Sequence, residues 1–577
     1  MNEVITDNLD LWTSALLAKS SAGRGSSGKQ ETYGIKKLRE LILELAVRGK
    51  LVPQDPNDEP ASVLLERIAE AEARLIEERK IRKEKPLPDI TEEEQPYDLP
   101  NGWVFVTLGD VAFSQAGFAF ESTFFNENGE GLPLIRIRDV GQLFSGTYYS
   151  GEYREEFLAL NGDYLISMDG EFRVSRWENG QALLNQRVSR LIFFDETVGK
   201  RFIADSLQAR LRELQGVKAY TTVDHLSGTQ IAEAVIGLPP LAEQHRIVAK
   251  VDEIMVLCDE LEEQQTRSIE AHQTLVETLL GTLTRAASPQ ELSEAWARIA
   301  NHFDTLFTTE HSIDQLKQTT LQLAVMGKLV PQDPNDEDVR VLLTRNDQRR
   351  CEVAQTDRRA DPDQQPILSV DDRWEIPGTW TWRGLGDLVL FVDYRGKTPA
   401  KQSSGIRLLT AKNVRKAQID LSPEEFLSER DYTEWMTRGL PKAGDVLFTT
   451  EAPMGNAAVV DLNERFALAQ RVICFQGYGA LDPAFLVLQI SSSQFQSILD
   501  RNGTGMTAKG IKASKLKQLP VAIPPLAEQH RIVAKVDELM ALCDALKVRI
   551  NEARTTQVYL ADAIVAQVVA NGGGDWP

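Results

Sequence analysis

Apolar residues recur along two stretches of the chain with the spacing of a helix that packs against another helix. Each stretch follows a pair of prolines, at 239–240 and at 524–525, and its apolar positions then alternate in steps of four and three. These positions are Ile247, Val251, Ile254, Cys258 and Leu261 in the first stretch and Ile532, Val536, Leu539, Cys543 and Leu546 in the second. Proline suits the start of a helix, and such steps align apolar side chains in one seam. We therefore predict packed helices over about 241–283 and 526–569.

Two long blocks of sequence each occur twice, in the same order. Residues 45–59 (LAVRGKLVPQDPNDE) match residues 323–337 except that Met326 replaces Arg48, and residues 238–261 closely match residues 523–546. Chance does not produce two matched blocks of this length, so the chain contains an internal duplication. Between the blocks the copies diverge, although Gln-Arg-Val recurs at 186–188 and 470–472. A fixed frame with two divergent inserts suggests one kind of partner, two targets and a pseudo-twofold arrangement.

Further helical patterns complete the frame. Helices are expected over 35–48 and 313–326, and each stops at a glycine, Gly49 or Gly327. A charged helix is expected over 59–85, another helical pattern over 291–307, and a flexible linker over 19–29. In the simplest assembly, the helix after the first insert pairs with the helix that opens the second copy. The final helix then folds back on the helix that opens the first copy.

The inserts contain short apolar runs broken by Gly, Asn and Asp, such as DYLISM and SRLIFF in the first and LVLFV and DVLFTT in the second. Such runs predict strand-rich domains. The predicted fold class is α+β, with two mixed α/β domains separated by long antiparallel, coiled-coil-like helices and related by a pseudo-twofold internal repeat. The predicted domains are an N-terminal extension and linker (1–34), N-terminal frame helices (35–99), the first insert (100–240), a central frame (241–376), the second insert (377–525), and a C-terminal frame helix and tail (526–577).

Composition and charge narrow the class of protein. The chain has 64 basic and 85 acidic residues and a net charge of −21, which argues against wrapping DNA by bulk charge. DNA binding would require local basic clusters or a larger complex that supplies phosphate contacts. The four cysteines lack C-x-x-C spacing, the N-terminus lacks a basic signal region, and no apolar stretch is long enough to span a membrane. These features predict a cytoplasmic protein.

The familiar motifs of catalysis are incomplete. Gly396-Lys397-Thr398 resembles the end of a phosphate-binding loop, but the first glycine of that motif would fall at Phe391. Asp482-Pro483-Ala484-Phe485 lacks the second proline of an adenine methyltransferase motif and is expected to be a structural turn. The six histidines show no metal-binding spacing. We expect no catalytic residue, no metal site and no cofactor in this chain.

Several segments resemble specificity subunits of type I restriction–modification enzymes. They are LPPLAEQHRIVAKVDE (238–253), GDVLFTTEAPMGNAAVV (444–460), AQRVICF (469–475), YRGKTP (394–399), GFAFES (117–122), PLIRIRDV (133–140), MDGEF (168–172) and LLNQRV (183–188). The resemblance covers roughly residues 35–570 and includes the duplicated architecture. The longer N-terminal extension and the GKLVPQDPNDE block depart from the general pattern and indicate one sub-branch of the family.

The resemblance implies a function and a set of partners. Each insert would be a target recognition domain that reads one half of a bipartite, asymmetric DNA site, and the helices would set the gap between the halves. Two methyltransferase subunits would dock on the frame and methylate adenine with S-adenosylmethionine. Two motor-nuclease (restriction/translocase) subunits would join to cleave unmethylated DNA with ATP and Mg²⁺. The chain would be the non-catalytic subunit of that complex.

Candidate DNA contacts follow from residue type. Base edges are read by Arg, Lys, Asn or Gln, and phosphates are held by Lys, Arg and small polar loops. The most basic segment is TGMTAKGIKASKLK (504–517), whose place in the first insert is taken by a less basic loop. The shared Gln-Arg pairs favour a common role, such as phosphate contact, over base reading. The predicted contacts are Arg136, Arg138, Arg173, Gln186, Arg187, Thr222, His225, Tyr394, Arg395, Lys397, Arg407, Lys412, Asn413, Met454, Asn456, Gln470, Arg471, Thr507, Lys509 and Lys512.

Two other functions compete with DNA recognition. The acidic charge is also typical of a protein-binding scaffold or decoy that never reads DNA, although the lysine-rich loop argues against it. An autonomous nuclease or methyltransferase is disfavoured by the missing motifs.

Overall fold

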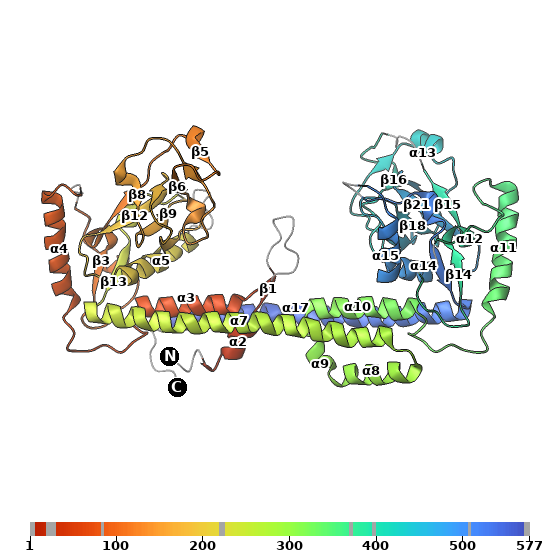
Figure 1. The fold of residues 1–577 in the computed structure, drawn as a ribbon, viewed down its shortest axis with the longest axis horizontal. Helices are drawn as coiled ribbons and strands as arrows, with labels where there is room; N and C mark the ends of the chain where they lie inside the picture. The colour runs from red at the N-terminus through yellow and green to blue at the C-terminus, as the bar shows by residue number, and fades with distance from the viewer. Residues whose placement is uncertain are drawn as a thin grey trace. The chain divides into compact units, whose positions relative to one another are not determined.

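The structure is a computed structural model that describes residues 6–18, 30–81, 86–217, 225–368, 373–394, 400–505 and 509–570 (Figure 1). The chain divides into two compact units: unit 1 contains Met1–Arg267 and Ala553–Pro577, and unit 2 contains Ser268–Glu552. The linker expected over 19–29 lies outside the described residues. Among the described helices, none is both long and apolar enough to cross a membrane.

Two long helices belong to both units. Helix α7 (Leu241–Arg285) begins in unit 1 and ends in unit 2, and helix α17 (Leu526–Ala570) begins in unit 2 and ends in unit 1. Each has 45 residues, so each is roughly 68 Å long at the usual helical rise. Both agree with the helices predicted from the apolar seams, and the opposite order in which they visit the units makes them antiparallel.

In unit 1 the short helix α3 (Tyr33–Val47) packs on both long helices (Figure 1). Its apolar side chains share a core with Ile247 and Val251 of α7 and with Ala561 and Val568 of α17. Arg39 of α3 forms ion pairs with Asp259 and Glu262 of α7 at 2.6 and 2.7 Å. The prediction that the final helix folds back on the helix that opens the first copy is therefore confirmed.

In unit 2 helix α10 (Glu310–Val325) occupies the corresponding place. Ile313 and Leu316 share a core with Leu280 of α7 and Cys543 of α17. Helices α8 (Pro289–Asn301) and α9 (Phe303–Leu306) complete this core. The predicted pairing of α7 with the helix that opens the second copy is confirmed.

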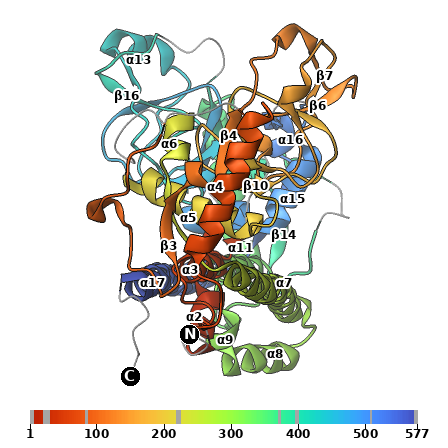
Figure 2. The ribbon, with the colours of Figure 1, turned by 90° about the vertical axis from the view of Figure 1, so that its left-hand side faces the viewer.

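The first insert combines two main sheets with helices, some of which are labelled in Figure 2. The four-stranded sheet has the order β10-β9-β12-β4, a five-stranded sheet has the order β5-β7-β6-β11-β8, and β13 pairs with β3. Helix α4 packs its buried face (Ala61, Leu64 and Ile68) on this core. The elements before the insert are α2 (Leu9–Ser14), β1 (Leu17–Ala18), β2 (Gln30–Glu31) and α4 (Ala61–Glu77). Those of the insert are β3 (Val104–Thr107), β4 (Ala112–Ala116), β5 (Phe125–Asn126), β6 (Leu132–Ile135), β7 (Tyr148–Tyr149), β8 (Leu158–Ala159), β9 (Tyr164–Ser167), β10 (Val174–Arg176), β11 (Ala182–Leu184), β12 (Val188–Phe193), α5 (Lys200–Val217), α6 (Gly228–Ala232) and β13 (Val235–Leu238).

The second insert repeats this topology. Its four-stranded sheet has the order β15-β21-β18-β19, which matches β4-β12-β9-β10, a second sheet has the order β17-β16-β20, and β14 pairs with β22. Both inserts also contain a parallel pair, β6 with β11 and β16 with β20. Helix α11 (Val339–Thr356) precedes the insert. The elements of the insert are β14 (Thr381–Gly384), α12 (Leu385–Leu388), β15 (Val389–Asp393), β16 (Ile406–Leu409), β17 (Phe426–Leu427), α13 (Glu429–Trp435), β18 (Val446–Thr449), β19 (Ala457–Val459), β20 (Phe466–Leu468), β21 (Val472–Gly477), α14 (Pro483–Ser491), α15 (Ser493–Asn502), α16 (Ala513–Leu516) and β22 (Pro520–Ile523). The α+β fold class and the internal repeat are therefore confirmed.

A buried glutamate fixes the start of each long helix. In unit 1 the indole of Trp103 donates to Glu243 Oε2 at 3.1 Å, and the amide of Gln54 donates to Glu243 Oε1 at 3.2 Å. In unit 2 the indole of Trp380 and the amide of Gln332 both donate to Glu528 Oε1 at 3.1 Å. Burial raises the pKa of both carboxyl groups. These contacts join the two duplicated blocks to the start of each insert.

Glycine is required beside this junction. Gly49 has φ +68°, and a Cβ there would lie 2.6 Å from Pro100 Cγ and 2.7 Å from Trp103 Cζ2. Gly327 has φ +67°, and its Cβ would lie 2.5 Å from Pro377 Cγ. The backbone conformation and the close approach both exclude a side chain, so the glycines predicted as helix stops also make room for the junction.

The indole donors can be tested by replacing tryptophan with phenylalanine. Trp103→Phe keeps most of the ring but removes a donor from a buried carboxylate, which should lower the free energy of unfolding by about 1–3 kcal/mol. Trp380→Phe should have a similar effect because the junction repeats. Urea unfolding monitored by circular dichroism measures both changes.

Trp296→Phe on α8 is the matched control, because Trp296 is 43% exposed and should change stability by less than about 0.5 kcal/mol. If Trp103→Phe were no more destabilising than Trp296→Phe, the indole–carboxylate bond would not stabilise the junction.

Candidate nucleic-acid interface

Three segments of the first insert cross at one point. They are the loop after β9, the residue before β12, and the segment that precedes α6. The N–H of Met168 donates to the carbonyl of Arg187 at 3.0 Å, and the N–H of Leu226 donates to the carbonyl of Met168 at 2.7 Å. These backbone bonds bring Asp169, Arg187 and His225 together, although they are far apart in the sequence.

The second insert has the same crossing. The N–H of Thr450 donates to the carbonyl of Arg471 at 3.0 Å, and the N–H of Ile511 donates to the carbonyl of Thr450 at 3.0 Å. The lysine-rich loop of the second insert therefore takes the place of the segment that carries His225 in the first. Because the bonds are between backbone groups, the crossing does not depend on the side chains that it presents.

The side chains at the first crossing form a compact polar cluster. Asp169 contacts Arg187 Nε at 3.2 Å and His225 Nδ1 at 2.7 Å, and Arg187 Nη1 lies 3.1 Å from His225 Nδ1. Arg187 is 47% exposed and His225 is 41% exposed. The carboxylate thus orients an arginine and a histidine that both remain accessible to a ligand. Nearby Arg173 pairs with Glu171.

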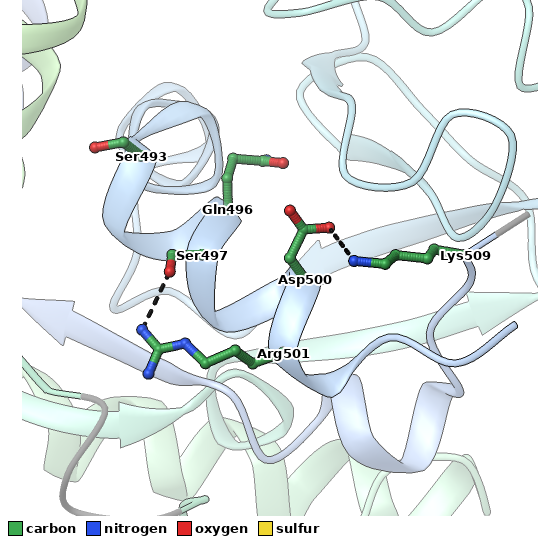
Figure 3. Close-up of a pocket in the computed structure, with 6 residues that line it drawn as sticks. All are labelled: Ser493, Gln496, Ser497, Asp500, Arg501 and Lys509. Carbon is green, nitrogen blue, oxygen red and sulfur yellow. Dashed lines mark hydrogen bonds and ion pairs between the residues drawn. The ribbon is translucent and has the colours of Figure 1, made fainter. Parts of the chain in front are cut away.

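The second crossing carries more positive charge. Arg471, half exposed, lies 3.6 Å from Glu451, as Arg187 lies beside Asp169. Lys509 is exposed and lies 3.7 Å from Asp500 (Figure 3), and Lys512 is exposed at the start of α16. This surface can hold an anion with several cationic groups, whereas the first crossing offers one arginine and one histidine.

Other predicted contacts also lie on the surface of the inserts. Arg136 directly precedes the turn Ile137–Asp139, and Arg138 lies within it. Arg138 donates to Ser145 Oγ at 3.0 Å and to Thr147 Oγ1 at 3.1 Å. Lys412 is exposed, as are Gln186 and Gln470.

Two predicted contacts are wrong because their side chains are buried. Asn413 is 0% exposed, accepts from the N–H of Thr410, and donates to the carbonyls of Asp420 and Pro423. Tyr394 is 1% exposed, and its hydroxyl donates to the carbonyl of Gly439. Burial raises the pKa of Tyr394 to about 12. Both side chains stabilise the second insert and cannot reach a ligand.

Three further predicted residues have side chains that are partly buried in contacts within the second insert. Arg407 is 16% exposed and lies between Glu424 and Glu464 and over the ring of Phe426. Met454 and Asn456 are half-buried, and Asn456 donates to the carbonyl of Val414 at 2.9 Å. Thr222, Arg395, Lys397 and Thr507 lie outside the described residues.

The sequence interpretation missed the carboxylates of the crossings. Asp169 and Glu451 each stand two residues after the end of a buried strand, β9 or β18, and each faces the arginine of the shared Gln-Arg pair. Their matching places after equivalent strands were a usable signal. Within the described ranges, no group of His, Cys, Asp and Glu side chains could hold a metal ion.

Comparisons with known proteins identify relatives along the whole chain. The family model described as "Type I restriction modification DNA specificity domain" matches residues 100–271 and 380–553. The chain is 36% identical to the EcoAI specificity subunit and 35% identical to the EcoEI specificity subunit, both type I restriction enzyme subunits of Escherichia coli, over 98% of this chain and 99% of each relative. A crystal structure of the HsdS subunit from Thermoanaerobacter tengcongensis matches with a TM-score of 0.39 at 16% identity, over 83% of this chain and 99% of that one.

Proposed function

The chain belongs to the family of type I restriction–modification DNA specificity subunits, and we propose that its two inserts each read one half of a bipartite, asymmetric DNA site. As a specificity subunit it is the non-catalytic part of its complex. The observation that supports two half-sites is the crossing, which has the same backbone bonds in both inserts but different side chains around it. The alternative of an acidic scaffold that does not read DNA has no support among the relatives.

The side chains at the crossings suggest a division of labour. Arg187 and Arg471 occur in both inserts beside a carboxylate, so they suit a contact that both half-sites share, such as a phosphate. The residues that differ, His225 and Arg173 in the first insert and Lys509 and Lys512 in the second, suit the distinction between the two half-sites. Lysine and arginine reach both guanine edges and phosphates, and histidine can donate or accept.

The frame exposes equivalent apolar side chains in both units, which would give one kind of partner two equivalent docking surfaces. Leu257 and Leu542 occupy equivalent positions on α7 and α17 and are 50% and 56% exposed. Leu275 and Leu560 form a second equivalent pair, so each unit exposes one leucine from each long helix. Apolar side chains repeated in this way support docking of two identical methyltransferase subunits. We propose that two restriction/translocase subunits join them, and that S-adenosylmethionine, ATP and Mg²⁺ bind to these partners.

The long helices suit control of the gap between half-sites. Because α7 and α17 each run from one unit into the other, we propose that their length sets the number of base pairs between the half-sites.

The central test of this function is the methylation pattern. Cells that express the chain with its methyltransferase partner should contain N6-methyladenine at one split motif with a fixed gap, mapped by methylome sequencing. Cells that express the partner alone are the control and should show no such motif. A contiguous motif, or no new motif, would overturn the proposal.

Partner docking can be tested with one charge in each unit. Leu257→Glu should remove about half of the methyltransferase that co-purifies with the chain, and Leu257→Glu with Leu542→Glu should remove nearly all of it, because a charge at an apolar contact is costly to desolvate. Native mass spectrometry measures the stoichiometry. Val341→Glu, at an exposed valine of α11, is the control and should leave the stoichiometry unchanged. Full occupancy in the double variant would rule out this surface.

The lysine loop makes a separate prediction about salt dependence. Lys509→Ala with Lys512→Ala should weaken duplex binding and lower the slope of log K against log salt by up to about 2, because each phosphate contact contributes about 0.9. Fluorescence anisotropy across a sodium chloride series measures the slope. Lys535→Ala, which removes an exposed cation of α17, is the control. An unchanged slope would remove the loop from the proposed interface.

A further inference from the structure

The two copies of the first frame block differ at one position, and the structure around that position differs between the units. In unit 1 the position is Arg48. Its guanidinium donates to Glu44 Oε2 at 3.2 Å, to Glu213 Oε1 at 3.5 Å and to the carbonyl of Val569 at 3.4 Å. It also lies over the ring of Tyr97, with 5.0 Å to the centroid. Arg48 therefore fills the space between α3, α5 and the end of α17.

The corresponding place in unit 2 is a cavity. Met326 replaces Arg48 within the block, and Gln322 replaces Glu44 just before it. Trp374 takes the place of Tyr97, because its indole donates to the carbonyl of Val325 at 2.9 Å as the Tyr97 hydroxyl donates to that of Val47 at 3.0 Å. The cavity has a volume of about 470 Å³. Its walls are Thr284, Gln322, Met326, Arg373, Trp374, Ser493, Gln494, Ser497, Ile498 and Arg501.

The charged side chains around Arg48 in unit 1 differ from those around the cavity of unit 2. In unit 1 two carboxylates, of Glu44 and Glu213, hold a cation of the protein itself. Among the described residues, the cavity walls of unit 2 contain two arginines, Arg373 and Arg501, and no carboxylate. The Nε of Arg373 is buried and has no hydrogen-bond partner among the described residues. Guanidinium groups together with serine hydroxyls and glutamine amides suit an anionic group with several oxygens.

The cavity lies next to the lysine loop. Ser493, Ser497 and Arg501 also line a second cavity of about 420 Å³, whose other walls are Gln496, Asp500 and Lys509. Figure 3 shows these six side chains on and beside α15, with Lys509 directed toward Asp500. One face of α15 thus leads from the loop proposed to contact DNA to the two arginines of the first cavity.

We propose that the cavity of unit 2 binds a backbone phosphate of DNA beyond the bases that the second insert reads. Unit 1 has no equivalent contact, because Arg48 fills the space there and Pro96 stands at the aligned place of Arg373. This inference rests on the proposed function and adds a second, position-specific anchor to one half of the DNA site. Phosphate is favoured over an acidic protein segment because the cavity continues toward the lysine loop.

The sharpest test uses a variant in which the cavity of unit 2 is filled by the same two side chains that fill the equivalent space in unit 1. Gln322→Glu with Met326→Arg recreates the pair of Glu44 and Arg48 without changing the net charge of the chain. We expect the slope of log K against log salt for a duplex to fall by about 1 to 2 and the affinity to fall on the order of tenfold near physiological salt. The measurement is fluorescence anisotropy on the full chain bound to its methyltransferase partner.

Two further variants separate charge from shape. Arg373→Ala with Arg501→Ala should lower the slope by a similar amount, and Arg373→Lys with Arg501→Lys should restore most of it. Arg48→Met with Glu44→Gln, which opens the place in unit 1 without supplying arginines, should leave the slope unchanged. Thermal melting by circular dichroism selects variants that fold as the wild type does.

The outcomes discriminate among the explanations. If the closed variant keeps the wild-type slope and affinity, the phosphate site is wrong. If it keeps DNA binding but loses the methyltransferase subunit on co-purification, the cavity takes an acidic protein segment, which also overturns the inference. If the wild-type complex binds DNA without salt dependence, the proposed function itself fails, which is a different result from failure of the closed variant alone.

Discussion

The frame depends on a carboxylate that is buried at the start of each long helix. Removing a charge from water is unfavourable unless hydrogen-bond donors replace the water, and the raised pKa of Glu243 and of Glu528 reflects that cost. The donors come from an indole at the start of the insert and from a glutamine of the first duplicated block. In unit 1 each oxygen of Glu243 has one of these donors, so changing Trp103 or Gln54 would leave a buried oxygen without that partner. In unit 2 both donors share Glu528 Oε1.

The inserts are free to diverge because the crossing that presents their polar residues is held by backbone bonds. The bonds of Met168 with Arg187 and Leu226 recur at Thr450 with Arg471 and Ile511, whatever the side chains. A change of side chain at the crossing therefore alters the surface without altering the strand order. The junction at Glu243 and Glu528 tolerates little change, whereas the side chains at the crossings can change freely. This difference is a physical basis for one kind of partner and two different half-sites.

The spacing of apolar residues along the chain predicted the helices of the frame well, but it predicted the residues of the contact surface poorly. The apolar seam of α7 and α17, the glycine stops and the fold-back of the last helix were predictable, because burial imposes a regular spacing on a helix. The roles of individual polar residues were not predictable in the same way. Asn413 is of a residue type that reads bases, but it is buried and forms hydrogen bonds with the backbone of Thr410, Asp420 and Pro423. Asp169 contacts Arg187 and His225, which are distant in the sequence. Such pairings follow from tertiary structure rather than from local pattern.

The acidic total also has a structural meaning. Several arginines of the inserts are paired with carboxylates, as Arg187 is with Asp169 and Arg471 with Glu451. Pairing orients each arginine but reduces the field that would draw DNA nonspecifically, since exposed ion pairs are weak and are readily exchanged for a stronger anion. A subunit built in this way gains little affinity from charge alone. In the proposed function, selectivity then depends on the geometry that each insert presents to its half-site.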